Sequence, residues 1–543
     1  MRSLFRRFKT LFKPQLESNR STKQVSGSST AEFDNIPSTA KLSARLAMIR
    51  KVLGESIDLV IREFEFEDES NISAAVIYLD GMVDNVKVDQ NILTAMMFQA
   101  QSIQAKEKLS PKKAYDKLVR NRISMGEIME KEKNSELFAH LVSGDTIIII
   151  DGYIPFIAAN TRAWEKRNVA EPENESVVRG PREGFNESLK VGLSMVRRRL
   201  KTPYLRFETF YIGRQTQTTV VLAYISNLAN PKLIREVKER LQRINTDAIV
   251  STGYLEDYLE DNPFSPFPQL KATERPDVVV AGLLEGRAAV LADNTPFAII
   301  APTTFFEFLQ GADDYYQRPW YGGALVRWLR LIAINIALLL PAFYVATITF
   351  HQEMIPTALL VSIAASREGV PFPAVVEALI MEGTFELLRE AGLRLPSPIG
   401  TAVSIVGALV LGEAAIRAGI VSPPMVIVVA LTAIASFSLP GFAAALSLRQ
   451  MRFPLILLAA VMGLFGVMFG LLVILIHLVS LRSFGVPYMS PLAPLMPRDL
   501  KDTFARPPQW AMSKRPRYLR SQDAVRQGED LMPHPPNSRK KKK

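Results

Sequence analysis

The sequence predicts an N-terminal soluble region of two subdomains, of α+β or α/β class, followed by an all-α helical transmembrane domain. Four apolar runs, at 331–350, 399–421, 425–447 and 455–481, are each long enough to cross a hydrocarbon core, which takes about 20 residues. Before the first run, short strand-like segments alternate with amphipathic ones, which is typical of mixed α/β units. The chain has 543 residues, too many for one domain.

We expect five segments along the chain. They are a basic amphipathic tail and linker (1–38), an N-terminal α/β subdomain (39–178), a second α/β subdomain (179–320), the helical membrane domain (321–482) and a basic, Pro-rich C-terminal tail (483–543). Residues 1–30 carry +6 and residues 498–543 carry +8, so the rest carries 11 − 14 = −3 of the net +11. Basic tails suit an anionic membrane leaflet. Without interleaved aromatic residues they do not indicate nucleic-acid binding.

Composition also argues against catalysis and metal binding. The chain has no cysteine, and its four histidines are scattered, so we expect no disulfide, no thiolate or histidine metal site and no cofactor. No Gly-rich phosphate loop, HExxH pair or other catalytic signature is present. The sequence therefore predicts a protein that is not an enzyme.

The first subdomain begins near residue 39 with a helix at 40–54. Alternating residues predict strands at 58–67 and 73–79, and helical patterns follow at 89–101, 111–118 and 134–142. A buried strand at 146–150 and a return strand at 153–158 complete the unit.

The second subdomain opens with RGPREGF (179–185) and a helix through residue 199. We expect strands at 204–212 and 218–225, helices at 231–244 and 254–259, and short strands at 277–280, 288–292 and 297–300. No internal sequence repeat is evident.

A polar cluster marks this opening segment. It contains Arg179, Arg182 and Glu183, with three further arginines at 197–199. Arginine offers a bidentate fork to carboxylates and phosphates. The cluster is either a site for an acidic ligand or a set of salt bridges between the two subdomains.

Between the first and second apolar runs lies a charged amphipathic stretch, 366–396. Helical spacing places Val376, Ile380, Gly383, Leu387 and Leu388 on one side and Glu382, Glu386, Arg389 and Glu390 on the other. This pattern predicts a helix at a membrane surface or against a partner. Glu377 falls on the apolar side, either as an edge carboxylate with a basic neighbour or as a polar group facing an aqueous path or a second subunit.

Ionisable residues inside apolar runs are candidates for function because placing a charged side chain inside a bilayer costs free energy. Glu413 and Arg417 are spaced to pair on one helix turn. The candidate coupling or pore residues are Glu377, Glu386, Arg389, Arg394, Glu413 and Arg417.

The number of crossings depends on the short segment 354–365. We expect it to be re-entrant or interfacial, which leaves four spans and places the basic C-terminus on the side of the N-terminus. If it crosses, there are five spans and the C-terminus lies opposite.

Several motifs together resemble one known family. They include YLDGMVD (78–84), RGPREGF (179–185), LLEGRAAVLADNTPF (283–297), DDYYQRPW (313–320), SREGVPFP (366–373) and FGVPYMSP (484–491). The region from about 40 to 510 resembles the A subunit of GerA-type spore germinant receptors, in the GerA/SpoVAF family. Two positions depart from the family pattern. Val191-Gly192 stands where many members have Thr-Asn, and Glu413 stands where many have Gln.

The resemblance implies a cytoplasmic two-part domain and a multi-pass membrane domain in the spore inner membrane. It also implies a permease-like B subunit and a lipoprotein C subunit as partners, nutrient sensing, and a homo-oligomeric cation channel that triggers germination. The alternatives are a non-conducting scaffold, a SpoVAF-like accessory protein and, last, a secondary transporter. The germinant, the conducted ion and the subunit number are left open.

Overall fold

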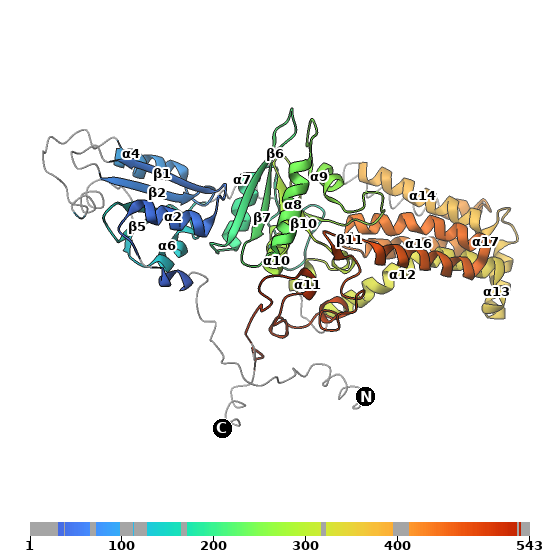
Figure 1. The fold of residues 1–543 in the computed structure, drawn as a ribbon. Helices are drawn as coiled ribbons and strands as arrows, with labels where there is room; N and C mark the ends of the chain where they lie inside the picture. Colours follow the sequence, from blue (N-terminus) through green and yellow to red (C-terminus); the bar gives the residue numbers. More distant parts are fainter. Residues whose placement is uncertain are drawn as a thin grey trace, which may run out of the picture.

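The computed structural model describes residues 31–36, 38–65, 72–97, 112, 127–163, 171–316, 322–394, 412–528 and 531–533. They form two α/β subdomains and a helical bundle arranged in a row, with the second subdomain in the middle (Figure 1). The basic stretch 1–30, most of the predicted helix at 111–118 and much of the apolar run at 399–421 lie outside the described residues.

The first subdomain is built on a five-stranded antiparallel sheet in the order β1-β2-β4-β5-β3. Successive side chains along β2 and β4 point to opposite faces of the sheet. One set packs against α2 and α6 and the other against the segment 83–96, so both faces of the sheet are covered. The strands are β1 (Leu59–Glu65), β2 (Ser73–Leu79), β3 (Ile128–Lys131), β4 (Thr146–Ile150) and β5 (Phe156–Ala159). The helical elements are η1 (Ala31–Asn35), α2 (Leu42–Leu53), α3 (Asn85–Lys87), η2 (Val88–Leu93), α4 (Thr94–Met97) and α6 (Asn134–Leu141).

The second subdomain repeats this strand order, because its sheet runs β6-β7-β9-β10-β8 and is also antiparallel. Helices α7 and α10 cover one face, and α8 and α9 cover the other. The strands are β6 (Leu205–Ile212), β7 (Thr218–Ile225), β8 (Lys271–Thr273), β9 (Ala288–Ala292) and β10 (Ala298–Ala301). The helices are α7 (Leu189–Arg199), α8 (Pro231–Arg243), α9 (Thr252–Leu259) and α10 (Pro276–Glu285). The structural repeat between the subdomains is not evident in the sequence.

One predicted strand of this subdomain is wrong. Residues 277–280 lie in α10, where Pro276 occupies the first turn and Gly286 ends the helix with a left-handed φ of 95°. Proline at a helix start and glycine just past its end are the ordinary helix boundaries. Two short edge strands, β3 and β8, were not predicted.

The bundle consists of α12 (Ala324–Phe350), α13 (Thr357–Arg367), α14 (Ala374–Arg394), α16 (Pro423–Phe437) and α17 (Phe442–Ser480), with η4 (Phe305–Leu309), α11 (Asp313–Tyr316) and η6 (Gln352–Met354) at its ends. Among the described residues, α12 and α17 are the two helices long and apolar enough to cross a membrane.

Helix α17 is an antiparallel hairpin that reverses at Gly463, whose φ is 60° and ψ is −142°. A side chain at Gly466 would collide with Leu458, and one at Gly470 with Leu455, so the two legs pack face to face. The reversal lies against His351, at the end of α12.

The apolar runs do not coincide with the helices. The run at 425–447 is divided between α16 and α17 by residues 438–441, which include Pro440, and the run at 455–481 contains the reversal. Helix α13 covers the segment proposed as re-entrant. It lies beyond the end of α12 and has no buried residue (Figure 1).

The C-terminal residues 482–528 return to the second subdomain. The Ser483 hydroxyl donates to the Gln269 carbonyl (2.7 Å), and Gln522 Nε2 donates to the Ala229 carbonyl (2.6 Å). The segment contains β11 (Arg482–Ser483), β12 (Val486–Pro487), α18 (Lys501–Phe504), η7 (Gln509–Ala511) and η8 (Arg517–Leu519). Its charge alone does not indicate this packing.

Candidate functional site: a charged seam in the bundle

Four charged side chains of α14, Glu377, Glu382, Glu386 and Arg389, contact other helices of the bundle and form what we call the charged seam. Helix α14 lies along α16 and α17 (Figure 1). Glu377 and Glu382 are both 0% exposed. Each acidic residue of the seam has an arginine partner on a different helix or turn.

The centre of the charged seam is the ion pair between Glu382 and Arg452 of α17. Arg452 is 1% exposed, and its Nε also donates to the Ala337 carbonyl of α12 at 2.9 Å. That carbonyl has no intrahelical donor, because Pro341, four residues later, lacks an N–H. One guanidinium therefore joins three helices, and the proline in α12 creates the acceptor it uses.

We call the two α/β subdomains together the head. Toward the head, the charged seam continues with Glu386 and Arg389. Arg449 Nη1 donates to Glu386 Oε2 at 3.1 Å. The Arg389 guanidinium lies 5.2 Å from the ring centre of Phe437 and 5.8 Å from that of Phe442. These two rings flank the turn between α16 and α17, so a cation–π contact holds that turn against α14.

At the far end, Glu377 joins the start of α16 to the end of α13. Its Oε2 accepts hydrogen bonds from the Ser422 N–H (2.9 Å) and hydroxyl (2.7 Å), and its Oε1 accepts one from Arg367 Nη2 (2.9 Å). The basic neighbour that the sequence allowed for is thus Arg367. The residue is buried rather than at an edge.

The polarity of α14 is the reverse of the prediction for a surface helix. The four charged residues of the seam face the bundle, whereas Leu387 is 73% and Ile380 39% exposed. A helix in water buries its apolar face and exposes its charges. This part of α14 therefore has the arrangement expected of a helix whose outer face meets apolar surroundings.

The other predicted coupling residues lie outside the charged seam. Arg394 pairs with Glu390, and Arg417 with Glu413, and the side chains in both pairs are more than half exposed. Sequence reasoning missed Glu382, Arg449 and Arg452 as functional candidates. The two arginines fall between apolar runs that were taken as separate spans, although the apolar residues on either side of them continue one helical pattern.

The predicted ligand or interdomain cluster is dispersed. Arg179 is exposed, Arg182 pairs with Glu171 at the surface, and Glu183 pairs with Arg198 and Arg199. Burial acts to raise the pKa of Glu183, but the two arginines lower it overall. These contacts hold the RGPREGF segment on α7 within the second subdomain.

A different arginine of the cluster joins the subdomains. Arg197, 1% exposed, donates from Nε to Asp58 Oδ2 (2.8 Å) and from Nη2 to Asp58 Oδ1 (3.0 Å). Its guanidinium also lies over the Phe207 ring at 4.7 Å. The salt-bridge interpretation thus applies to Arg197.

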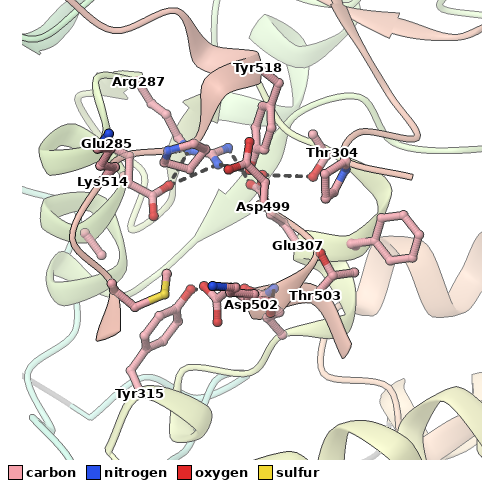
Figure 2. A pocket seen from close by; sticks show the side chains of 18 of the residues that line it. Glu285, Arg287, Thr304, Glu307, Tyr315, Asp499, Asp502, Thr503, Lys514 and Tyr518 are labelled. Carbon is pink, nitrogen blue, oxygen red and sulfur yellow. Dashed lines mark hydrogen bonds and ion pairs between the residues drawn. The ribbon is translucent and has the colours of Figure 1, made fainter. Parts of the chain in front are cut away.

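A cavity of about 150 Å³ lies where the C-terminal segment crosses α10 and η4. Figure 2 shows Glu285, Arg287 and Tyr518 on one side of it and Tyr315 and Asp502 on the other. Arg287 donates to Glu307 Oε1 (2.6 Å) and Glu285 Oε2 (3.1 Å). Because the buried charges at its centre, Arg287, Glu285 and Glu307, pair with one another, we assign the cavity no ligand.

The same junction links the head to α12. Asp502 accepts a hydrogen bond from Arg327 Nη1 at 3.0 Å, in the first turn of that helix. Burial raises the pKa of Asp502, although Arg327 acts to lower it. Burial likewise raises the pKa of Glu285. No group of His, Asp and Glu able to hold a metal ion occurs among the described residues.

Glu256, on α9, provides a pH-dependent prediction. Burial, and then the charges of Glu260 and Asp257, raise the pKa of Glu256 to about 7 from an ordinary 4.5. The folded state therefore favours the protonated form of Glu256. The contribution of this group to the free energy of unfolding is fully present below about pH 4.5 and is lost as pH rises through 7. We expect Glu256→Gln to raise the thermal unfolding temperature at pH 8 and to leave it nearly unchanged at pH 4. Exposed Glu239→Gln is the control, and an equal shift at both pH values would contradict the prediction.

Comparison with known proteins gives a consistent result. The family model for the Bacillus/Clostridium GerA spore germination protein matches residues 47–518. Spore germination protein KA of Bacillus subtilis is 47% identical over 503 residues, covering 93% of this chain and 90% of that protein. The uncharacterized membrane protein YfkQ of the same organism is 45% identical (84% and 87%), and GerLA of Bacillus cereus is 42% identical (88% and 95%). A crystal structure of the N-terminal domain of the A subunit of the Bacillus megaterium germinant receptor GerK3 is 35% identical, with a TM-score of 0.40, and covers 49% of this chain and 96% of that one.

Proposed function

Because the chain belongs to the Bacillus/Clostridium GerA family of spore germination proteins, we propose that it is the A subunit of a nutrient-responsive germinant receptor. The family model covers nearly all of the head and the whole bundle. The family relationship confirms the resemblance drawn from the sequence motifs.

The protein works, in this proposal, as a multi-pass protein of the spore inner membrane. The observation that carries this is the polarity of most of α14, where the charged seam faces the bundle and Leu387 is exposed. Ionisable residues in membrane helices face the bundle interior and pair there. Arg327 and Arg330 precede the apolar part of α12, and basic residues 498–528 lie on the same side, which favours a cytoplasmic head.

The charged seam is the part of the bundle best suited to transmit a signal. It joins α14 to α12, α13, α16 and α17 through charged side chains, and a shift of α14 would have to exchange these pairs. We propose that copies of the chain assemble into a homo-oligomeric cation channel, with α14 and its Glu377, Glu386 and Arg389 coupling the head to the pore. Arg394, Glu413 and Arg417, being exposed, are available to the aqueous path or to a neighbouring copy.

The partners in this proposal are a permease-like B subunit and a lipoprotein C subunit, and the trigger is a nutrient. The chain itself performs no reaction and holds no cofactor. The family relationship is what supports the proposed partners, the nutrient trigger and the absence of catalysis.

Ion flux provides the test of the channel. With the B and C subunits in liposomes, germinant is expected to release a trapped monovalent cation. Glu386→Lys should change this flux, because it places two positive groups, the introduced ammonium and the Arg449 guanidinium, where one ion pair stood. Glu390→Lys is the matched control on the same helix, since Glu390 is 57% exposed.

The alternatives give other results. A scaffold or a SpoVAF-like accessory protein conducts nothing, so flux carried by another protein would be unchanged in the Glu386 variant. A secondary transporter would show saturable exchange rather than channel currents. Absence of flux in the unmodified complex with germinant present would argue against the channel.

A further inference from the structure

A loop of the head carries an unusually exposed aromatic side chain next to the bundle. Residues 260–270 connect α9 to β8, and Phe264 in this loop is 96% exposed. The loop contains Pro263, Pro266 and Pro268, which restrict its backbone. A restricted loop loses little entropy on binding, so Phe264 is presented in a fixed position.

The loop is fastened to both legs of the α17 hairpin. The Ser265 hydroxyl and His477 Nε2 lie 2.9 Å apart, and the Ser447 hydroxyl donates to the Pro266 carbonyl. Phe267, 1% exposed, packs against the His477 ring at 6.0 Å. Phe264 is therefore held at the level where the helices meet the head.

Aromatic rings continue from this loop across the junction. Phe267 lies 6.5 Å from Phe305, which lies 5.7 Å from Phe306. Phe306 lies 5.9 Å from Phe504, which in turn lies 6.3 Å from Trp328 on α12. Trp328, the far edge of this aromatic layer, is 51% exposed. The layer thus has an exposed aromatic side chain at each edge.

We propose that this aromatic layer marks the membrane–water interface and that the head itself contacts the bilayer, through Phe264 inserted at headgroup depth opposite Trp328. The inference rests on the proposed membrane location. It commits to lipid because Phe264 is next to Ser265, which contacts His477 in the last turns of α17, where Ile476 is 60% and Val479 52% exposed. Aromatic side chains are enriched at this depth, where one part of the ring is apolar and the surroundings are partly wet.

The natural absence of cysteine allows a direct test. Single variants Phe264→Cys, Trp328→Cys, Leu472→Cys and Val86→Cys, in the full chain, are labelled with an environment-sensitive fluorophore and placed in nanodiscs. Leu472 is 53% exposed, halfway along the second leg of α17. Val86 is 61% exposed and belongs to the first subdomain, which lies at the end of the molecule away from the bundle (Figure 1). Nitroxides are placed in the lipid either near the headgroup or deep in the acyl chain.

We expect the Phe264 and Trp328 labels to shift to the blue and to lose most fluorescence with the shallow nitroxide. The Leu472 label should respond most to the deep nitroxide, and the Val86 label to neither. If the Phe264 label behaves like Val86 while Leu472 is quenched, the membrane location stands and lipid contact by the head is refuted. A blue shift without nitroxide quenching would indicate a protein partner and equally overturn the inference. If Leu472 is not quenched either, the membrane location itself fails.

Discussion

Replacing Arg452 with methionine is expected to lower the free energy of unfolding by about 3–5 kcal/mol, the usual effect of removing one partner of a buried ion pair. Glu382 is 0% exposed and would be left as an uncompensated buried carboxylate. The Ala337 carbonyl would also lose the donor that replaces the missing Pro341 N–H. Denaturant unfolding of the detergent-solubilised protein, followed by helical circular dichroism, measures the loss.

Arg417→Met is the matched control, because Arg417 and Glu413 form an ion pair four residues apart whose side chains are 79% and 58% exposed. Such a pair contributes about 0.3–0.5 kcal/mol. Equal destabilisation by the two substitutions would contradict the assigned burial of Arg452. The double variant Glu382→Leu with Arg452→Met should recover much of the stability, since apolar replacements of both partners are tolerated. If that double variant also retains germinant response, the Glu382–Arg452 pair has no role in coupling.

The strands of the head were predicted best where burial is complete or alternation is regular. Residues 146–150 read Thr-Ile-Ile-Ile-Ile and form β4, and both the predicted strand at 218–225 and β7 end at Ile225. Short edge strands such as β8 carry too few residues for a pattern. Residues 277–280 read as a strand because three consecutive valines favour one, whereas the proline and glycine at the boundaries decide for helix α10.

The charged seam could be predicted only in part, for a physical reason. Helical periodicity separates the two faces of α14 correctly, since Ile380 and Leu387 share one side and Glu382 and Arg389 the other. It does not say which side meets the surrounding medium. A helix at a membrane surface would turn its charges toward water, and ending each apolar run before a charged segment left Arg449 and Arg452 between two runs. That the bundle crosses a membrane remains a proposal, but this inversion is what the proposal explains.

Replacing Arg197 with methionine is expected to lower the free energy of unfolding by about 3–5 kcal/mol, because it leaves Asp58 buried without its partner. Asp58 is 6% exposed and belongs to the first subdomain, whereas Arg197 lies on α7 of the second. The pair is the buried ionic contact across that boundary in the described part of the chain, so its loss should loosen the two subdomains from each other. Thermal unfolding followed by circular dichroism measures the change, and faster proteolytic separation of the first subdomain from the second would report the loosening.

Arg198→Met provides the control one position along the same helix. Arg198 is 24% exposed and pairs with Glu183 inside the second subdomain, so its removal should cost about 0.2–1 kcal/mol and leave the boundary intact. If both variants are equally destabilised, burial of Arg197 is not what sets its contribution. If Arg197→Met is destabilised without faster cleavage, the two subdomains are held mainly by their apolar contacts. In the receptor proposed above, a rigid boundary between the subdomains would let the first one act on α12 only through the second. The Arg197 variant is therefore also expected to respond to germinant more weakly than the Arg198 variant.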